Sequence, residues 1–246
     1  MRIGVYVDGF NLYYGARKHC GRGTHGWRWL DLRALVGPMA GWQGSRITRV
    51  IYCTARVEAA DNASGRADQT AYLGALVEAG SVDVIAEGRY VSWAKEEPLV
   101  NEERGTYRPT AYRWSGEHWD ARLPLRRLPD REDTDLHRVM ATVQKREEKG
   151  SDVNVASHLL FDVLTGVVDA AIVITNDSDL ELPLRMAREH VPVGTVNPST
   201  NPTAGALKGR PDDGVGRHWW RRLTAAEYLG SQLPEVVGNH RKPDGW

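Results

Sequence analysis

Short apolar runs rich in β-branched residues alternate with helical patterns along this chain, and this alternation strongly limits how it can fold. The apolar runs span residues 3–7, 47–54, 82–86, 170–175 and 191–196. The helical patterns span residues 11–19, 31–39, 69–79 and 179–190. Strand, helix and strand in this order form a parallel sheet through right-handed crossovers. We therefore predict an α/β fold with a parallel sheet of about five strands and helices on both faces.

The segment that follows Ser151 has a clear amphipathic pattern. Ser151 is a favourable N-cap residue, which predicts that a helix begins there. Apolar residues then recur at helical spacing, at Val153, Ala156, Leu160, Val163, Leu164 and Val167. This spacing predicts a helix that packs these side chains against the sheet.

The middle of the chain lacks any such periodicity. Residues 88–132 are rich in Arg, Pro, Trp and Tyr, so we predict an irregular insertion in the α/β core. Residues 201–246 are predicted to form a C-terminal extension whose terminal helix, at about 224–232, packs on the core. The 246 residues are enough for one α/β domain with such additions.

Composition excludes several classes of protein. The 32 Lys and Arg residues balance the 32 Asp and Glu residues, so no net positive field attracts nucleic acid or anionic lipid. Cys20 and Cys53 are the only cysteines, which argues against a disulfide framework and against a structural zinc site. The apolar run at the N-terminus is too short for a signal peptide or a membrane span, so we predict a cytoplasmic protein.

Carboxylates follow the predicted strands at positions where ligands bind in parallel sheets. Asp8 ends the first strand, Asp177 and Asp179 follow the strand at 170–175, and Asp152 opens a helix. Each of the last three is also a suitable helix-capping or first-turn residue. Clustered carboxylate oxygens suit hard cations, so the set predicts a site for Mg²⁺ or Mn²⁺.

Three segments resemble the signature blocks of the NYN domain family, whose fold is similar to that of the PIN-like nucleases. The segments are VYVDGFNLYYG, EEKGSDVNVASHLL and AAIVITNDSDLELPLRMAREH. The resemblance implies an NYN domain over residues 1–200 that cleaves RNA with Mg²⁺ or Mn²⁺. It assigns metal binding and catalysis to Asp8, Asp152, Asp177 and Asp179, and it places Asn11 beside them to orient a water molecule or a phosphate.

Other residues are candidates for binding an RNA substrate. Lys149 lies immediately before the turn at residues 150 and 151, where it could contact a scissile phosphate. The alternative is that Lys149 is a solvated residue at the end of a charged run. Ser178 either contacts a ligand or supports the turn around it. Arg108 and Arg113 belong to a patch of basic and aromatic residues at about 104–127, and a second such patch lies at 217–222.

Two other functions remain open. The chain could be a catalytically silent module that binds RNA or a protein, or a hydroxylase that acts on a small molecule. No flavin, haem or non-haem iron motif supports the hydroxylase. The glycines at 21, 23 and 26 have GxGxxG spacing but follow a predicted helix, so we interpret them as a loop. A homodimer is compatible with each of these predictions.

Overall fold

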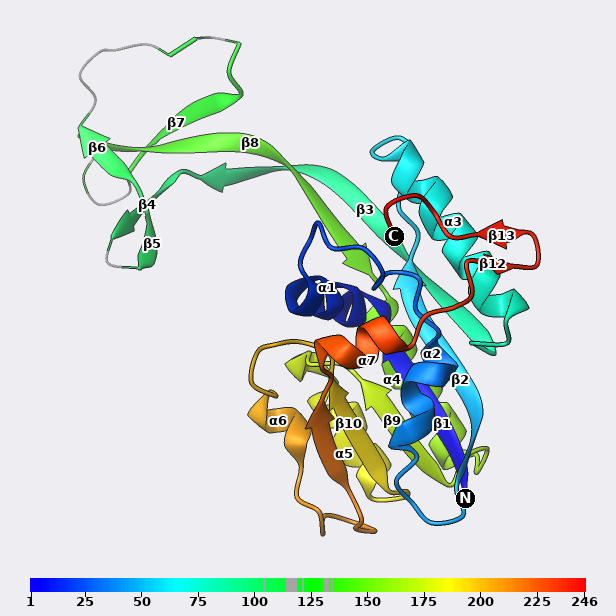
Figure 1. Cartoon of the computed structure of the whole chain (residues 1–246). Coiled ribbons are helices and arrows are strands. Elements are labelled where there is room, and N and C mark those ends of the chain that lie inside the picture. The colour runs from blue at the N-terminus through cyan, green and yellow to red at the C-terminus, as the bar shows by residue number, and fades with distance from the viewer. Residues whose placement is uncertain (104, 114–118, 121, 131–132, 134) are drawn as a thin grey trace. The chain divides into compact units, whose positions relative to one another are not determined.

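The computed structural model describes residues 1–103, 105–113, 119–120, 122–130, 133 and 135–246 (Figure 1). Within these ranges the chain forms two compact units. The first unit combines Met1–Tyr90 with Glu148–Trp246, and the second is the segment Val91–Glu147. Each unit is described separately below.

Six parallel strands form the sheet of the first unit. They are β1 (Arg2–Asp8), β2 (Arg46–Ala55), β3 (Val84–Pro98), β9 (Ala170–Ile174), β10 (Val193–Asn197) and β11 (Trp219–Arg222). Their order is β11-β10-β9-β1-β2-β3, and every neighbouring pair is parallel. In the described chain the sheet continues from β3 into antiparallel strands and reaches nine strands. The predicted α/β class is confirmed, whereas the sheet is larger than predicted and mixed.

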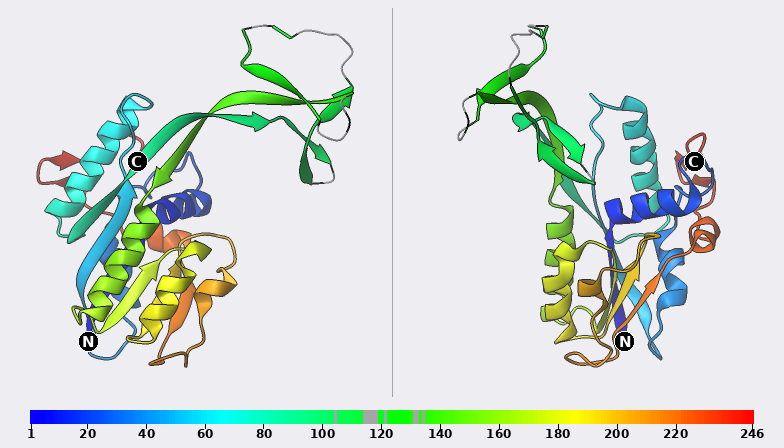
Figure 2. Two further views of the ribbon diagram at one scale, coloured as in Figure 1. Left: turned by 180° about the vertical axis from the view of Figure 1, so that it is seen from behind. Right: turned by 90° about the vertical axis from the view of Figure 1, so that its left-hand side faces the viewer.

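Helices cover both faces of this sheet. They are α1 (Gly9–Cys20), α2 (Leu32–Val36), α3 (Ala63–Glu78), α4 (Ser151–Leu164), α5 (Glu181–Arg188), α6 (Gly205–Lys208) and α7 (Ala225–Gly230), with 3₁₀ turns η1 (Gly37–Met39) and η2 (Ser178–Leu180). Side chains alternate between the faces of a strand. Val5 and Val7 therefore pack with α1, α2, α3 and α7, while Tyr6 packs with α4 and α5. Figure 2 shows the helices on the two faces of the sheet. A short hairpin of β12 (Val236–Val237) and β13 (His240–Arg241) packs on α3.

The helix α4 is rotated relative to its predicted orientation. Val155, Leu159 and Val163 are buried, whereas Val153 is 66% exposed and Leu164 is 55% exposed. The physical reason is a buried polar residue on the inner face of the helix.

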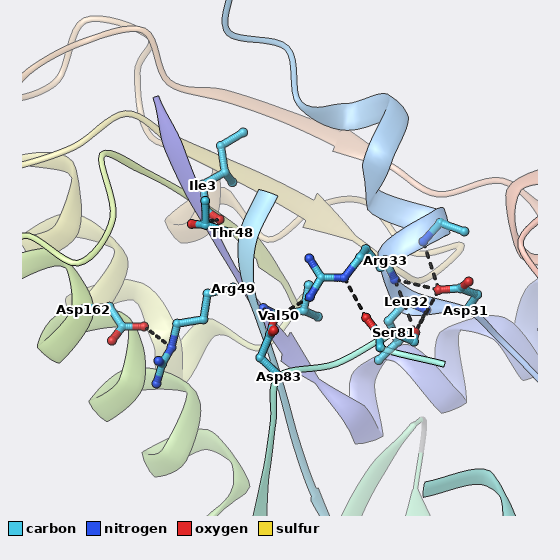
Figure 3. A network of polar contacts seen from close by, with 12 residues as sticks. Ile3, Asp31, Leu32, Arg33, Thr48, Arg49, Val50, Ser81, Asp83 and Asp162 are labelled. Atoms are coloured by element: carbon cyan, nitrogen blue, oxygen red, sulfur yellow. Dashed lines mark hydrogen bonds and ion pairs between the residues drawn. The ribbon is translucent and has the colours of Figure 1, made fainter. Parts of the chain in front are cut away.

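That residue is Asp162, which is 1% exposed. Its Oδ2 forms an ion pair of 2.9 Å with Arg49 Nε on β2 (Figure 3) and accepts a hydrogen bond of 3.1 Å from the Tyr6 hydroxyl. A buried charge needs such partners, so Asp162 must face the sheet. The apolar spacing did not reveal this requirement.

A second polar network ties α2 to the sheet (Figure 3). Asp31 caps α2 by accepting hydrogen bonds of 3.0 Å from the amides of residues 33 and 34. The Ser81 hydroxyl donates to the same carboxylate over 2.8 Å. Arg33 then pairs with Asp83 at 2.5 Å, and Asp83 accepts from the Val50 amide of β2 at 2.7 Å. One N-cap therefore links a helix, a central strand and the turn before β3.

The second unit consists of strands where an irregular segment was predicted. Besides the distal part of β3, it contains β4 (Val100–Glu103), β5 (Thr106–Pro109), β6 (Ala111–Arg113), β7 (Leu125–Pro129) and most of β8 (Leu136–Lys149). Strands β4 and β5 form an antiparallel pair, and β6 and β7 each pair with β8. Val139 is the one apolar residue that is buried among those described in this unit. Strands exposed on both faces lack the alternation that identifies a strand in a sequence.

The described ranges include no helix with both the length and the apolar character needed to cross a bilayer. Location in the cytoplasm stays a prediction.

Candidate functional site

Asp8, the first of the predicted site residues, lies at the carboxyl end of β1 and caps α1. It is 1% exposed. Its carboxylate accepts hydrogen bonds from the Asn11 amide at 3.0 Å, from Asn11 Nδ2 at 2.6 Å and from the Thr175 hydroxyl at 3.0 Å. Burial raises the pKa of Asp8, and these hydrogen bonds partly oppose that effect. Asp8 and Asn11 therefore form one hydrogen-bonded unit between β1, α1 and β9.

The other three predicted carboxylates lie near Asp8. Asp177 caps the turn η2 by accepting a hydrogen bond of 3.1 Å from the Asp179 amide, and Asp179 is exposed. Asp152 lies in the first turn of α4. Burial, followed by the charges of Asp8, Asp177 and Glu148, raises the pKa of Asp152 to about 6. The negative charges of these carboxylates therefore act on one another. This agrees with the prediction that the acidic residues converge at one edge of the sheet.

The convergence does not amount to a metal centre. Among the described residues, no three His, Cys, Asp or Glu side chains are arranged so that they could hold a metal ion. Asp8 and Asp177 instead use carboxylate oxygens to cap backbone amides. The predicted metal set is thus corrected by the geometry, while participation of Asp8, Asn11, Asp152, Asp177 and Asp179 in catalysis stays a prediction.

The raised pKa of Asp152 leads to a testable effect on stability. Because its folded-state pKa of about 6 lies above the ordinary value of 3.8, its contribution to stability is complete below pH 3.8 and is lost as the pH rises through 6. We expect Asp152→Asn to avoid this loss and to stabilise the protein at pH 8 by about 1 kcal/mol, after allowance for the screening of a half-buried charge. Chemical denaturation at pH 4 and at pH 8 measures the effect, which should vanish at pH 4.

Asp169 provides a control of opposite sign for that experiment. Hydrogen bonds from Arg2 lower the pKa of Asp169 to about 2. Its contribution is therefore present above its ordinary pKa of 3.8 and is lost as the pH falls toward 2. Asp169→Asn should destabilise the protein at pH 8, and stabilisation by both variants would contradict the assignment.

The predicted substrate-binding residues lie in different places. Ser178 is the exposed first residue of η2, and Lys149 is the last residue of β8. Arg108 lies on β5 and Arg113 on β6, so both belong to the second unit. Arg113 forms an ion pair with Asp135 at 3.5 Å, which reduces the charge it presents to a ligand. Residues 104 and 114 of the same predicted patch lie outside the described ranges, and the substrate roles stay predictions.

A different site emerges from the packing of α1, β2, α3 and the C-terminal segment. A cavity of about 450 Å³ lies among these elements, within the size range of small-molecule sites. Seven of its lining residues are aromatic: Phe10, Tyr13, Tyr14, Tyr52, Tyr72, Tyr90 and Trp246. None of the predicted acidic residues is among the lining residues. The cavity therefore offers aromatic surface on which a flat ring can pack.

Local packing explains how these aromatic side chains come together. Phe10, Tyr13, Tyr14 and Arg17 recur at helical spacing, so α1 presents them on one face. The helix approaches β2 closely because Gly9 has no side chain, and a methyl group there would lie 2.7 Å from the Cys53 carbonyl oxygen. Glycine at position 9 thus allows the wall formed by α1 to meet the wall formed by β2.

The C-terminal segment completes the cavity and runs beside α3 (Figures 1 and 2). Trp246 packs against Trp29 and Tyr72, with ring centroids 6.3 and 5.8 Å apart respectively. Arg28 Nη1 holds this segment by donating a hydrogen bond of 3.2 Å to the Gly245 carbonyl. The segment that reads as an extension in the sequence is therefore part of the candidate site.

Two of the polar side chains that line the cavity are already engaged in hydrogen bonds. The Tyr72 hydroxyl donates to the Leu30 carbonyl at 2.9 Å, and Gln69 bonds the backbone at Ala55 and Val57. Burial raises the pKa of Tyr52 to about 12, so this phenol remains neutral at physiological pH. These residues therefore offer aromatic surface and shielding from water rather than ionised groups.

The chain thus has an α/β fold with a cavity in the size range of small-molecule sites. No family model matches the chain. The chain is 29% identical to 6-hydroxy-3-succinoylpyridine 3-monooxygenase HspA from Pseudomonas putida, over an alignment that covers 100% of this chain and 75% of that protein. A solved structure of a protein of unknown function from Vibrio parahaemolyticus aligns with a TM-score of 0.42 and 12% identity, over 90% of this chain and 92% of that one.

The first of these similarities corrects the predicted function. A Mg²⁺- or Mn²⁺-dependent ribonuclease is contradicted, because the relative is named as a monooxygenase and a monooxygenase is an oxidoreductase, not a hydrolase. The same finding contradicts Mg²⁺ or Mn²⁺ as the cofactor and favours the hydroxylase alternative. The acidic residues do not distinguish the two functions, because capping carboxylates and metal-binding carboxylates occupy the same ends of strands. Binding of RNA and formation of a homodimer stay predictions.

Proposed function

We propose that this protein is a monooxygenase that hydroxylates a small aromatic molecule bound in the aromatic cavity. The observation that carries the proposal is the cavity itself, whose walls combine seven aromatic side chains in about 450 Å³. The similarity to a protein named as a pyridine monooxygenase supports the reaction type. A substituted pyridine ring is therefore the class of substrate that we infer.

The reaction needs an electron donor besides oxygen. At a ring carbon that bears hydrogen, the C–H bond and O₂, with two electrons and two protons, give a C–OH bond and one water molecule. At a ring carbon that bears an acyl chain, as position 3 of 6-hydroxy-3-succinoylpyridine does, the same O₂, electrons and protons replace the bond between ring and chain by C–OH and release the chain as a carboxylic acid. We infer that the electrons originate from a reduced nicotinamide. A flavin or a similar redox cofactor, when bound, would pass these electrons to oxygen.

The residues of the cavity fit a flavin as well as a pyridine. Both are flat heteroaromatic rings, and Phe10, Tyr13 and Tyr72 provide faces on which such a ring packs. Arg17 lines the same space and provides a positive charge for an anionic substituent. In the proposed site, buried Tyr52 and Tyr72 exclude water from the reacting ring, while the side chains of α1 orient it.

The finer classification of the fold is part of this proposal. We infer a PIN-like core related to the NYN family that carries an oxidoreductase site. The strand order β10-β9-β1-β2-β3 supports this inference, as do the carboxylates at the carboxyl ends of β1 and β9.

Isotope labelling tests the proposed reaction. The purified protein is incubated with 6-hydroxy-3-succinoylpyridine, ¹⁸O₂, NADH or NADPH, and FMN or FAD. We expect a hydroxylated product that contains one ¹⁸O atom, detected by mass spectrometry. Absence of ¹⁸O from the product under every combination would contradict the proposal.

The two phenylalanines of the chain provide a matched pair of variants. Phe10 lines the cavity, whereas Phe161 is 64% exposed on α4. Loss of one aromatic contact costs about 1 to 1.5 kcal/mol, so we expect kcat/KM to fall about tenfold in Phe10→Ala. Phe161→Ala should retain the activity of the unchanged protein. Equal losses of kcat/KM in the two variants would show that the reaction does not take place in the aromatic cavity.

A further inference from the structure

The charge of the aromatic cavity is strongly unbalanced. Arg17, Arg22 and Arg28 line it, together with one acidic side chain, that of Asp68. None of the three arginines forms an ion pair with a carboxylate among the described residues. Elsewhere in the first unit Arg33 and Arg56 pair closely with acidic residues. The arginines of the cavity thus lack the acidic partner that Arg33 and Arg56 have.

A second cavity, of about 490 Å³, shows that this imbalance is not general. It lies beside α5 and α6 and is also lined by three arginines. Three carboxylates line it as well, namely Glu181, Glu189 and Asp213. That cavity is charge-balanced by the protein itself, whereas the aromatic cavity is not.

Arg28 is held in place without being neutralised. Its Nη1 and Nη2 donate to the carbonyls of Gly245 and Arg22 at 3.2 and 2.8 Å, and its guanidinium lies 5.0 Å from the centre of the Trp27 ring. Its Nε is buried and has no hydrogen-bond partner. A guanidinium that is fixed in position, and whose charge no carboxylate neutralises, is preorganised for an anion.

We propose that the aromatic cavity recognises its ligand through an anionic group that is bound by Arg17, Arg22 and Arg28. The ligand class is a flat aromatic ring that bears a carboxylate or a phosphate. The ring packs on the tyrosines and the anion lies at the arginines, because arginine forms paired hydrogen bonds with both kinds of anion. This inference rests on the proposed function, because it concerns the same cavity. It adds that the anionic group of the ligand determines specificity.

Two kinds of ligand carry such an anionic group, and calorimetric titration distinguishes between them. The anion is either the carboxylate of an aromatic substrate or the phosphate of a flavin mononucleotide. One arm compares 6-hydroxy-3-succinoylpyridine with its terminal amide. The other arm compares FMN with riboflavin, which lacks the phosphate. In at least one arm the anion should bind about tenfold more tightly than its neutral partner.

The variants Arg17→Gln and Arg22→Gln, and the double variant, connect that preference to the arginines. No hydrogen bond or ion pair within the described residues uses the side chain of Arg17 or Arg22, so these substitutions should not disturb the fold. We expect the affinity for the anion to fall about tenfold in the double variant, and the affinity for the neutral partner to change by less than about twofold.

Arg46→Gln is the matched control for these variants. Arg46 is exposed at the first residue of β2, while Tyr52 and Ala55, near the other end of that strand, line the cavity. The control should bind both members of each pair like the unchanged protein. Preference for the acid alone assigns the site to substrate, and preference for FMN alone assigns it to cofactor; either result supports the proposal.

Two results would overturn the proposal. The first is equal affinity for the anionic and neutral members of both pairs. The second is a preference for the anion that persists in the double variant. Because the titrations measure binding without turnover, arginine-dependent binding of the acid with no incorporation of ¹⁸O would refute the monooxygenase while leaving the anion site established.

Discussion

Trp29→Ala is expected to lower the free energy of unfolding by about 4 kcal/mol, because the substitution empties a fully buried indole site. Trp29 is 0% exposed, and its Nε1 donates a hydrogen bond of 2.7 Å to the Pro234 carbonyl. Its ring packs against Tyr72 and Trp246, whose centroids lie 5.8 and 6.3 Å away. Both of these neighbours line the aromatic cavity, so affinity for aromatic ligands should fall with stability.

Trp220→Ala is the matched control for this measurement. Trp220 is 48% exposed, and its main partner is the ammonium group of Lys208, 4.8 Å from the ring centre. An exposed cation–π contact of this kind contributes about 0.5 to 1 kcal/mol. Urea denaturation of the two variants should therefore give clearly different midpoints. Similar midpoints would show that the indole of Trp29 is not part of the core.

Gly15→Ala is expected to destabilise the protein by about 2 to 3 kcal/mol, because it overpacks a contact between backbones. In an exposed helix the same change would stabilise by about 1 kcal/mol. At position 15, however, the added methyl group would overlap the carbonyl of Pro198, with 2.6 Å to its carbon atom. The backbone of α1 and the loop after β10 would have to separate.

Gly74→Ala on α3 distinguishes this overlap from a general effect of helical glycines. A methyl group at position 74 would meet the imidazole of His240, a half-buried side chain that rotates more easily than a backbone moves. We expect the gain in helix propensity to offset this contact, with a net change of less than about 1 kcal/mol. Thermal unfolding of the two variants measures the difference. A destabilisation of Gly74→Ala as large as that of Gly15→Ala would contradict the explanation.

Much of the α/β core is predictable from local patterns. The strand at residues 3–7 corresponds to β1 at Arg2–Asp8, and the helix expected after Ser151 is α4 at Ser151–Leu164. β-branched runs depend on neighbours in sequence, so they can be read without the fold. The N-cap predicted at Ser151 was wrong, because Gly150 is the N-cap of α4 and the Ser151 hydroxyl donates to Glu148. The orientation of α4 was wrong because it depends on Asp162, whose partner Arg49 is distant in sequence.

The candidate site was only partly predictable. Asp8, Asp152 and Asp177 do lie near one another, as the rule for the carboxyl ends of parallel strands implies. Their interpretation as metal ligands was wrong, since a carboxylate that caps a helix has the same position and residue type as one that binds a cation. The helical spacing of Phe10, Tyr13 and Arg17 is a feature of the sequence that indicates one wall of the aromatic cavity.

Hydrophobic periodicity and capping residues were sufficient to establish the class of fold and the position of the acidic edge, because both act over a few residues of chain. The aromatic cavity required the folded chain. Its walls originate from α1, β2, α3 and the C-terminal segment, and Tyr52, Tyr72 and Trp246 become neighbours only after the sheet has formed. The charge imbalance at the arginines likewise depends on which carboxylates lie within reach, and only packing between distant segments determines that.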